Sequence, residues 1–377
     1  MTSQPVTRVA CLTPPGRGAI ATLGLHGPLA WDVVRQLFRT RRGAELPASP
    51  RAGRTWFGRI GTDISDEVIL AVKQTEPVLS LEVHCHGGRE AVRWLVDLFR
   101  ARGLEVCSSD DFLRASVSNP LRAEAALALM HAPTIRTAAI LLDQYHGAFE
   151  NAVADIVASL DRGDAAAAKA QLAELARYIP LGRHLTTPWR VTVAGAPNVG
   201  KSSLVNALAG YQRSVVAATP GTTRDVVTVS LAVDGWPVEL ADTAGQREGD
   251  ESLEKAGIQR AREAAVAADL CLWVLDASTE PAWPDAGAGR VQLIVNKVDL
   301  PPAWDLNLAK GAVRVSAQTG EGLQELCAAL SGWLVPEIPR AGTAMPFLKR
   351  HFNALDDASR SMTVDQAEEA RACLRTL

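Results

Sequence analysis

Short apolar runs separated by glycine and proline occupy residues 1 to about 115. Four of these runs have the length of β-strands: 9–12, 19–25, 68–72 and 79–83. Segments with apolar residues at helical spacing lie between them, at 30–38 and 89–102. This mixture of periods predicts a mixed α/β domain, for which we set the bounds 1–115.

The next stretch, 116–187, favours helix almost throughout. Alanine, leucine, glutamate and arginine dominate 122–177, and runs typical of strands are nearly absent. Pro133 and Gly163 are the main interruptions, so we expect two or three helices. Prolines and a glycine at 180–188 mark a linker, and helical patterns return at 347–361 and 364–377.

Apolar strands alternate with amphipathic helices from 189 to about 335. The expected strands are 190–194, 227–233, 238–241, 270–275, 291–295 and 313–316. This alternation predicts a mostly parallel sheet covered by helices on both faces.

Composition narrows the class of protein. The 377 residues correspond to two or three domains, and 47% hydrophobic with 21% charged residues excludes a disordered chain. A net charge of −3 lacks the basic field of a dedicated nucleic-acid binder, so any RNA contact must be local or supplied by a partner. The six cysteines form no CxxC pair, and neither a signal peptide nor a membrane span is recognisable, so we expect a cytoplasmic protein.

The strongest motif is Gly195-Ala-Pro-Asn-Val-Gly-Lys-Ser202, which matches the GxxxxGK[ST] phosphate-binding loop between a strand and a helix. Its glycines allow the backbone to wrap a phosphate, and the helix N-terminus presents free N–H groups. Lys201 would reach the β- and γ-phosphates, and the Ser202 hydroxyl would bind Mg²⁺. The expected contacts of this loop are Gly195, Asn198, Val199, Gly200, Lys201, Ser202 and Ser203.

Two further motifs follow strands at the expected positions. Asp242-Thr-Ala-Gly245 places a carboxylate for Mg²⁺ and a backbone N–H for a γ-phosphate. Asn296-Lys297-Val-Asp299 selects guanine, because the Asp299 carboxylate accepts two hydrogen bonds from the guanine N1–H and N2–H₂ groups, a pair that adenine lacks. Ser316-Ala317 follows the next strand and would close the base pocket.

A switch segment is expected between these motifs, at Thr219-Pro-Gly-Thr-Thr-Arg-Asp225. A threonine there would complete the coordination of Mg²⁺ and move when the γ-phosphate leaves. Thr223 is the favoured ligand, and Thr222 is the other candidate. Together the phosphate loop and the DTAG, NKVD and Ser316-Ala317 motifs predict a protein that binds GTP and GDP and hydrolyses GTP.

The motifs, read with the N-terminal zone, resemble those of the tRNA-modification GTPase family called MnmE or TrmE. In 188–336 the similar stretches are GAPNVGKSSLVNALAG, ATPGTTRDVV, LADTAGQRE, NKVDL and SAQTGEGL, several of which are shared with other Era-related GTPases. The more specific similarity is N-terminal: Thr13-Pro-Pro-Gly-Arg-Gly-Ala-Ile20 is similar to the TPPGRGAI signature, and Glu82 to Gly88 to an E-x-x-x-H-G-G segment.

The resemblance implies an architecture and a set of partners. The N-terminal domain would bind a tetrahydrofolate derivative and dimerise, and an Era/Ras-like G domain (188–336) would be inserted into a helical domain (116–187 with 343–377). With a FAD-dependent partner, the family installs an aminomethyl-type group on C5 of the wobble uridine of tRNA. Potassium would bind Asn198 and promote dimerisation of the G domains, and Glu248 would orient the attacking water.

Three departures from the family pattern concern its chemistry. The chain ends in Ala372-Cys-Leu-Arg-Thr-Leu377, where the family has a C-x-G-K tail, and we expect Cys373 to be a half-buried helix residue. The helical domain is expected to be short. Gln246 follows the DTAG motif, where glutamine orients water in Ras-type enzymes, so Gln246 and Glu248 are both candidates for that role.

Two N-terminal features leave alternatives open. In a strand, His84 and His86 share a face while Cys85 points away, so a structural or pterin-pocket role is preferred to a metal site. Arg17 is either a folate contact or a turn residue.

Two other functions are consistent with the GTPase motifs: a regulatory GTP switch that has lost the modification chemistry, and a ribosome- or assembly-associated GTPase.

Overall fold

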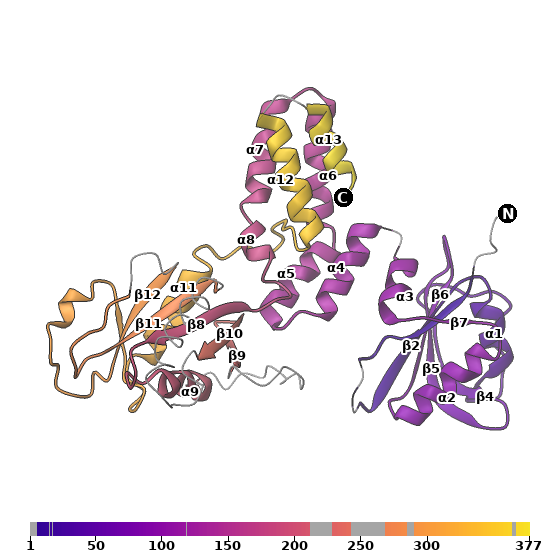
Figure 1. The fold of residues 1–377 in the computed structure, drawn as a ribbon. Helices are drawn as coiled ribbons and strands as arrows, with labels where there is room; N and C mark the ends of the chain where they lie inside the picture. The colour runs from indigo at the N-terminus through magenta and orange to yellow at the C-terminus, as the bar shows by residue number, and fades with distance from the viewer. Residues whose placement is uncertain are drawn as a thin grey trace, which may run out of the picture. The chain divides into compact units, whose positions relative to one another are not determined.

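The computed structural model describes residues 6–14, 16, 18–117, 119–211, 228–242, 268–284, 290–363 and 367–377, without the side chains of Asp242 and Thr363. By their contacts the residues form two compact units, Met1–Leu127 and Ala128–Leu377. Each unit contains one β-sheet and several helices, as Figure 1 shows, so the chain is a mixed α/β protein. The division into three domains predicted from the sequence stays a prediction.

A seven-stranded sheet is the framework of the first unit, in the order β3-β4-β5-β6-β2-β1-β7. Neighbouring strands are antiparallel except β1 and β7, which are parallel. The strands are β1 (Arg8–Cys11), β2 (Ile20–His26), β3 (Phe38–Thr40), β4 (Thr55–Gly61), β5 (Ser65–Gln74), β6 (Ser80–His86) and β7 (Glu105–Val106). The sequence pattern did not predict β3, β4 and β7, because β3 and β7 are very short and glycines interrupt β4.

Helices cover both faces of this sheet to different extents. α1 (Ala30–Leu37) and α2 (Arg89–Arg100) bury Trp31, Leu95 and Phe99 in one cluster with the inward-facing strand residues. α3 (Ser109–Ser116) lies over the opposite face at Gly24, where a Cβ would come within 2.5 Å of the Phe112 ring. α4 (Pro120–Met130) crosses the boundary between the two units.

The second unit contains a six-stranded sheet in the order β13-β12-β11-β8-β10-β9. Five of its strands are parallel, and only β9 runs antiparallel to its neighbour β10. The strands are β8 (Trp189–Gly195), β9 (Thr228–Val233), β10 (Trp236–Asp242), β11 (Leu270–Asp276), β12 (Val291–Asn296) and β13 (Val313–Arg314); α9 (Lys201–Tyr211), the short helix η1 (Leu306–Leu308) and α11 (Leu323–Leu334) accompany them.

The helices that precede the six-stranded sheet in the sequence pack against the helices that follow it. They are α5 (Ile135–Tyr145), α6 (Ala148–Asp161), α7 (Ala165–Ala176), α8 (Ile179–Gly182), α12 (Lys349–Thr363) and α13 (Ala367–Arg375). Residues 120–176 therefore contain four helices rather than the expected two or three, because the chain also breaks at Gly147, where φ is 102°. Figure 1 shows α12 and α13 beside α6 and α7.

One buried glutamine joins these early and late segments. Gln144, 2% exposed, donates from Nε2 to the Thr343 carbonyl at 3.0 Å and accepts at Oε1 from the Met345 N–H at 3.0 Å. The Phe149 ring packs nearby, 5.9 Å from the ring of Phe347. The segment after the six-stranded sheet is therefore bound to the helices that precede it.

The same helices contact the sheet through the β9–β10 turn. Asp234 and Gly235 both have positive φ, 49° and 79°, as a two-residue hairpin turn of type I′ requires. Arg136 of α5 donates from Nη1 to the Asp234 carboxylate at 3.0 Å, and its guanidinium lies 5.1 Å from the Trp236 ring centroid. None of the helices within the described ranges has the length and apolarity needed to cross a membrane.

The glutamine contact generates a stability prediction. Replacing Gln144 with alanine leaves the Thr343 carbonyl and the Met345 N–H without their buried partners, so we expect the free energy of unfolding to fall by about 3 kcal/mol. The neighbouring Asp143, whose exposed carboxylate accepts from the Gly342 N–H at 2.8 Å, is the matched control. Its alanine variant should lose less than about 1 kcal/mol in urea unfolding followed by circular dichroism. Equal losses in the two variants would contradict the role of Gln144.

Candidate functional site

The loop between β8 and α9 wraps closely because two of its residues are glycine. Gly195 and Gly200 have φ of 141° and 93°, values that disfavour any side chain. A Cβ at Gly195 would lie 2.4 Å from the Val274 carbonyl oxygen, and one at Gly200 would lie 2.4 Å from the Asn296 amide nitrogen. Both glycines of the motif are therefore required, because at each position a neighbouring group occupies the space that a side chain would need.

Lys201 is the first residue of α9 and is 8% exposed. Its ammonium donates to the carbonyl oxygens of Gly195 at 3.1 Å and Ala196 at 2.8 Å. These bonds keep a positive charge inside the loop at a helix N-terminus, where an anionic ligand gains from the ammonium and from the helix dipole together. The arrangement matches the chemistry of a phosphate site.

Asn296 connects the three motifs that surround this loop. It is the last residue of β12 and is 1% exposed. Its Nδ2 donates to the Val199 carbonyl at 2.9 Å, and its Oδ1 accepts from the Ala317 N–H at 3.0 Å. One amide side chain thus joins the phosphate loop, the NKVD motif and the Ser316-Ala317 loop.

Lys297 makes a second link from the NKVD motif to the phosphate loop. Its Nζ donates to the Asn198 carbonyl at 2.8 Å and to the Asp276 carboxylate at 2.6 Å. Lys297 and Asn198 both have left-handed backbones, with φ of 64° and 62°. The Asn198 side chain is exposed, whereas its carbonyl oxygen is held by the lysine.

Asp276 is a site residue that the sequence reasoning missed. Its carboxylate, 4% exposed, also accepts from the N–H and hydroxyl of Ser278 at 2.8 and 2.7 Å. Burial by itself would raise the pKa of Asp276, but the hydrogen bonds from Lys297 and Ser278 outweigh it and hold the pKa below its usual value. The available signal was an acidic residue that ends the apolar run Leu270–Leu275.

The residues expected around a base lie on neighbouring loops. The backbone N–H of Val298 donates to the Val315 carbonyl at 3.3 Å, which brings the NKVD loop beside the Ser316-Ala317 loop. The Asp299 side chain is exposed. Ser316 is fully buried, and its hydroxyl accepts from the Thr319 N–H at 3.1 Å, so it shapes its own loop.

The expected γ-phosphate side of the site is only partly described. Asp242 ends β10, where its backbone pairs with Val193 of β8, and Ser202 and Ser203 are exposed in the first turn of α9. The remaining candidates lie outside the described residues: Arg17, Thr222, Thr223, Gly245, Gln246 and Glu248.

The two histidines of β6 each have another partner. His84 and His86 lie on one face of β6 and Cys85 on the other, buried, as the strand period predicts. The His84 ring is 3.0 Å from the Thr22 hydroxyl, and the His86 ring is 2.5 Å from the Asp66 carboxylate. Within the described ranges, no group of three such ligands is arranged to hold a metal.

Comparisons with known proteins point to GTPases. Residues 190–297 match the family described as 50S ribosome-binding GTPase. The tRNA modification GTPase MnmE of Symbiobacterium thermophilum is 33% identical over 371 residues, covering 85% of this chain and 80% of the relative. That of Rhodopseudomonas palustris is 33% identical over 396 residues, covering 95% and 88%. A crystal structure of Aquifex aeolicus Era bound to GDP and aluminium fluoride is 25% identical, covers 46% of this chain and 67% of that one, and has a TM-score of 0.30.

The position of Asn296 generates a prediction for ligand binding. Replacing Asn296 with alanine leaves the Val199 carbonyl and the Ala317 N–H unpaired in a buried site, so we expect the affinity for a fluorescent GDP analogue to fall by roughly tenfold or more. Asn307, whose exposed amide oxygen accepts from Arg314 at 3.1 Å, is the matched control, and its alanine variant should bind normally. Wild-type affinity in the Asn296 variant would show that the three loops hold their positions without it.

Proposed function

The chain belongs to the family of tRNA modification GTPases called MnmE, and we propose that it uses GTP binding and hydrolysis to modify C5 of the wobble uridine of tRNA, together with a FAD-dependent partner. The chain is a GTPase of this family. The modification chemistry, the tRNA substrate and the partner are the proposed part.

The observation that carries the GTP site is the junction at Asn296. The Asn296 side chain binds the glycine-containing loop, whose interior holds the Lys201 ammonium, and Asn296 itself begins the loop that ends in Asp299. This arrangement supports the proposal, because one buried side chain fixes the candidate phosphate loop relative to the candidate base loops. We propose that Gly195, Asn198, Val199, Gly200, Lys201, Ser202 and Ser203 contact the phosphates, and that Asn296, Lys297, Asp299, Ser316 and Ala317 surround guanine.

The exposed Ser202 hydroxyl and the end of β10 are suited to hold Mg²⁺ beside that loop. Ser202, Asp242 and a threonine, Thr223 or Thr222, would be its ligands, with Gly245 offering its N–H to the γ-phosphate. The ion would supply charge neutralisation between the β- and γ-phosphates. Lys201 would neutralise the same charge from inside the loop, and Gln246 and Glu248 are the two candidates for orienting the attacking water.

Three further features belong to the same proposal. Potassium would bind at Asn198, whose side chain is exposed and whose carbonyl oxygen accepts a hydrogen bond from Lys297. Dimerisation of the G domains would follow. A tetrahydrofolate derivative would bind the N-terminal domain, at Arg17 and on the face of β6 that carries the half-exposed Glu82 and His84. The protein would act in the cytoplasm as a homodimer, with domains 1–115, 116–187 plus 343–377, and 188–336.

The guanine assignment is tested at one carboxylate. Replacing Asp299 with asparagine removes the acceptor pair that matches the guanine N1–H and N2–H₂ groups, so the preference for GTP over XTP should fall by roughly 100-fold or more. Glu280→Gln removes the same charge from an exposed position outside the proposed base site and should leave the preference unchanged. An unaltered ratio of the two kcat/KM values in the Asp299 variant would refute its role.

The modification itself is tested in a deletion strain of a host that has no second member of the family. We expect nucleoside analysis of its tRNA to show the loss of the C5 modification at the wobble uridine, and a plasmid copy of the gene to restore it. A copy with Lys201→Ala should fail to restore it, because the phosphate charge is no longer compensated. Unchanged tRNA in the deletion strain would contradict the proposal and leave a regulatory GTP switch as the function.

A further inference from the structure

Positive charge is concentrated in one short segment of the first unit. Residues 35–59 contain seven arginines and a single acidic residue, Glu45, although the whole chain has a net charge of −3. The segment comprises the end of α1, β3, the loop that follows it and most of β4. Because the rest of the chain is acidic on balance, this segment is a local basic surface.

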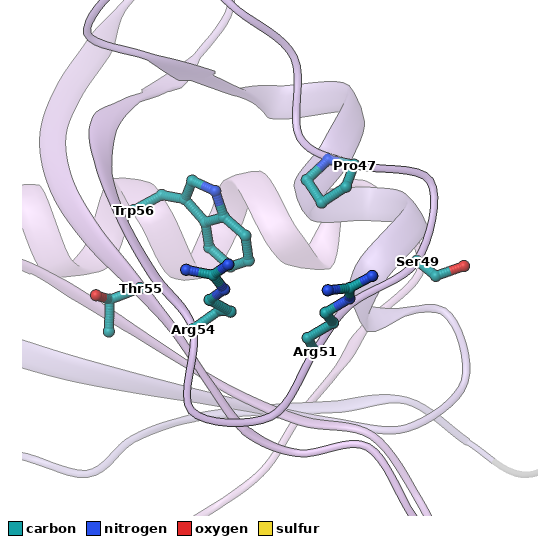
Figure 2. Close-up of a pocket in the computed structure, with 6 residues that line it drawn as sticks. All are labelled: Pro47, Ser49, Arg51, Arg54, Thr55 and Trp56. Carbon is teal, nitrogen blue, oxygen red and sulfur yellow. The ribbon is translucent and has the colours of Figure 1, made fainter.

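A cavity of about 510 Å³ opens within this surface. Figure 2 shows the guanidinium groups of Arg51 and Arg54 and the ring of Trp56 bordering the same space. Pro47, Ser49 and Thr55 complete its lining, so no carboxylate lines it. The volume is within the usual range of small-molecule sites, about 300–1,000 Å³.

The walls of the cavity are held from the core. The buried indole of Trp31 donates to the carbonyl oxygens of Pro47 and Ala48, both at 3.2 Å. On the other side the Gly53 N–H donates to the Val72 carbonyl at 2.8 Å, and the Val72 N–H donates to the Arg54 carbonyl at 2.9 Å. The loop that carries both arginines is therefore attached at one end to α1 and at the other to β5.

The two arginines are available to a ligand. Among the described residues neither Arg51 nor Arg54 forms an ion pair, and Glu45 lies 3.9 Å from Arg39 instead. A planar guanidinium pairs in a bidentate way with phosphate, and two unpaired arginines beside each other favour an anion with several oxygens. An indole at the same cavity adds a flat apolar surface on which a nucleobase stacks.

We propose that this cavity binds a nucleotide unit of an RNA strand, with phosphate oxygens at Arg51 and Arg54 and the base against Trp56. The inference rests on the proposed function, for which the RNA is tRNA. The Trp56 ring lies 5.7 Å from the Trp31 ring on its core side, and its other side borders the cavity. An acidic peptide would satisfy the arginines but has no base to place against the indole, so RNA is the favoured class. Arg41, whose guanidinium lies 5.9 Å from the centroid of the exposed Phe57 ring, extends the basic surface beyond the cavity.

The test measures binding of a labelled anticodon stem-loop RNA to the full chain by fluorescence anisotropy between 50 and 200 mM KCl. We expect the Arg51→Ala/Arg54→Ala variant to bind roughly tenfold more weakly at 100 mM KCl. The slope of log affinity against log salt should shrink by about 1.4, because each lost phosphate contact on a single strand contributes about 0.7. Arg89→Ala/Arg93→Ala on α2 removes two exposed arginines elsewhere in the unit and should keep more than half of the wild-type affinity.

A second variant separates recognition from charge. Arg51→Lys/Arg54→Lys keeps both charges but loses the bidentate fork, so its salt slope should stay near the wild-type value while its affinity falls about threefold. GTP turnover without RNA should be unchanged in all variants, which shows that they are folded.

The outcomes distinguish this site from the proposed function. If wild-type protein binds the RNA and the alanine variant matches the α2 control, the cavity is not the RNA site, and the proposed function stands. Displacement of the RNA by an equal charge of polyglutamate would also overturn the nucleotide assignment. If wild-type protein binds no RNA, this inference fails, and the tRNA analysis of the deletion strain decides separately whether the proposed function fails with it.

Discussion

The amide of Asn296 is the contact on which the geometry of the proposed GTP site depends. Its donor and its acceptor are each used once, toward the phosphate loop and toward the loop after β13. Both partners are backbone groups, so the bond specifies where two loops lie whatever their side chains are. Burial makes the bond directional as well as attractive, because an unpaired amide there would cost roughly 1–3 kcal/mol. Aspartate would replace the donor by an acceptor and lose half of the junction.

The glycines and the lysines of the site follow from this close packing. Gly200 has to lack a side chain because the Asn296 amide occupies the space of a Cβ. Lys297 bridges the Asn198 carbonyl and the buried Asp276 carboxylate, so its charge is compensated inside the protein rather than by a ligand. Lys201 donates to the carbonyl oxygens of Gly195 and Ala196, which hold its ammonium inside the phosphate loop. The two lysines of the site thus differ in their partners: Lys297 is paired with a buried carboxylate, whereas Lys201 donates to carbonyl oxygens of the phosphate loop.

The second unit depends on contacts between segments that are far apart in the sequence. Gln144 joins the helices before the six-stranded sheet to the chain after it, and Arg136 joins the same helices to the β9–β10 turn. That hairpin lies between the expected switch segment and Asp242, because β9 begins at Thr228 and β10 ends at Asp242. The helices that precede and follow the sheet are therefore attached, through Arg136, to the β9–β10 strand pair. This pair connects the expected switch segment with Asp242 of the proposed GTP site.

The strands and loops of the GTP site could be predicted from the sequence, because each is a local pattern: an apolar run of strand length, then Gly195–Ser202, Asn296–Asp299 or Ser316-Ala317. The break at Gly147 and the strands β3, β4 and β7 were missed, since a histidine-glycine pair and two- or three-residue strands carry little periodic signal and glycines interrupt β4. The sequence by itself determined which residues are candidates for binding phosphate and guanine. Only the tertiary structure decided that Asp276 holds Lys297, that Asn296 joins three loops and that Arg51 and Arg54 share a cavity with Trp56, because these contacts form between residues whose separation in the chain carries no periodic signal.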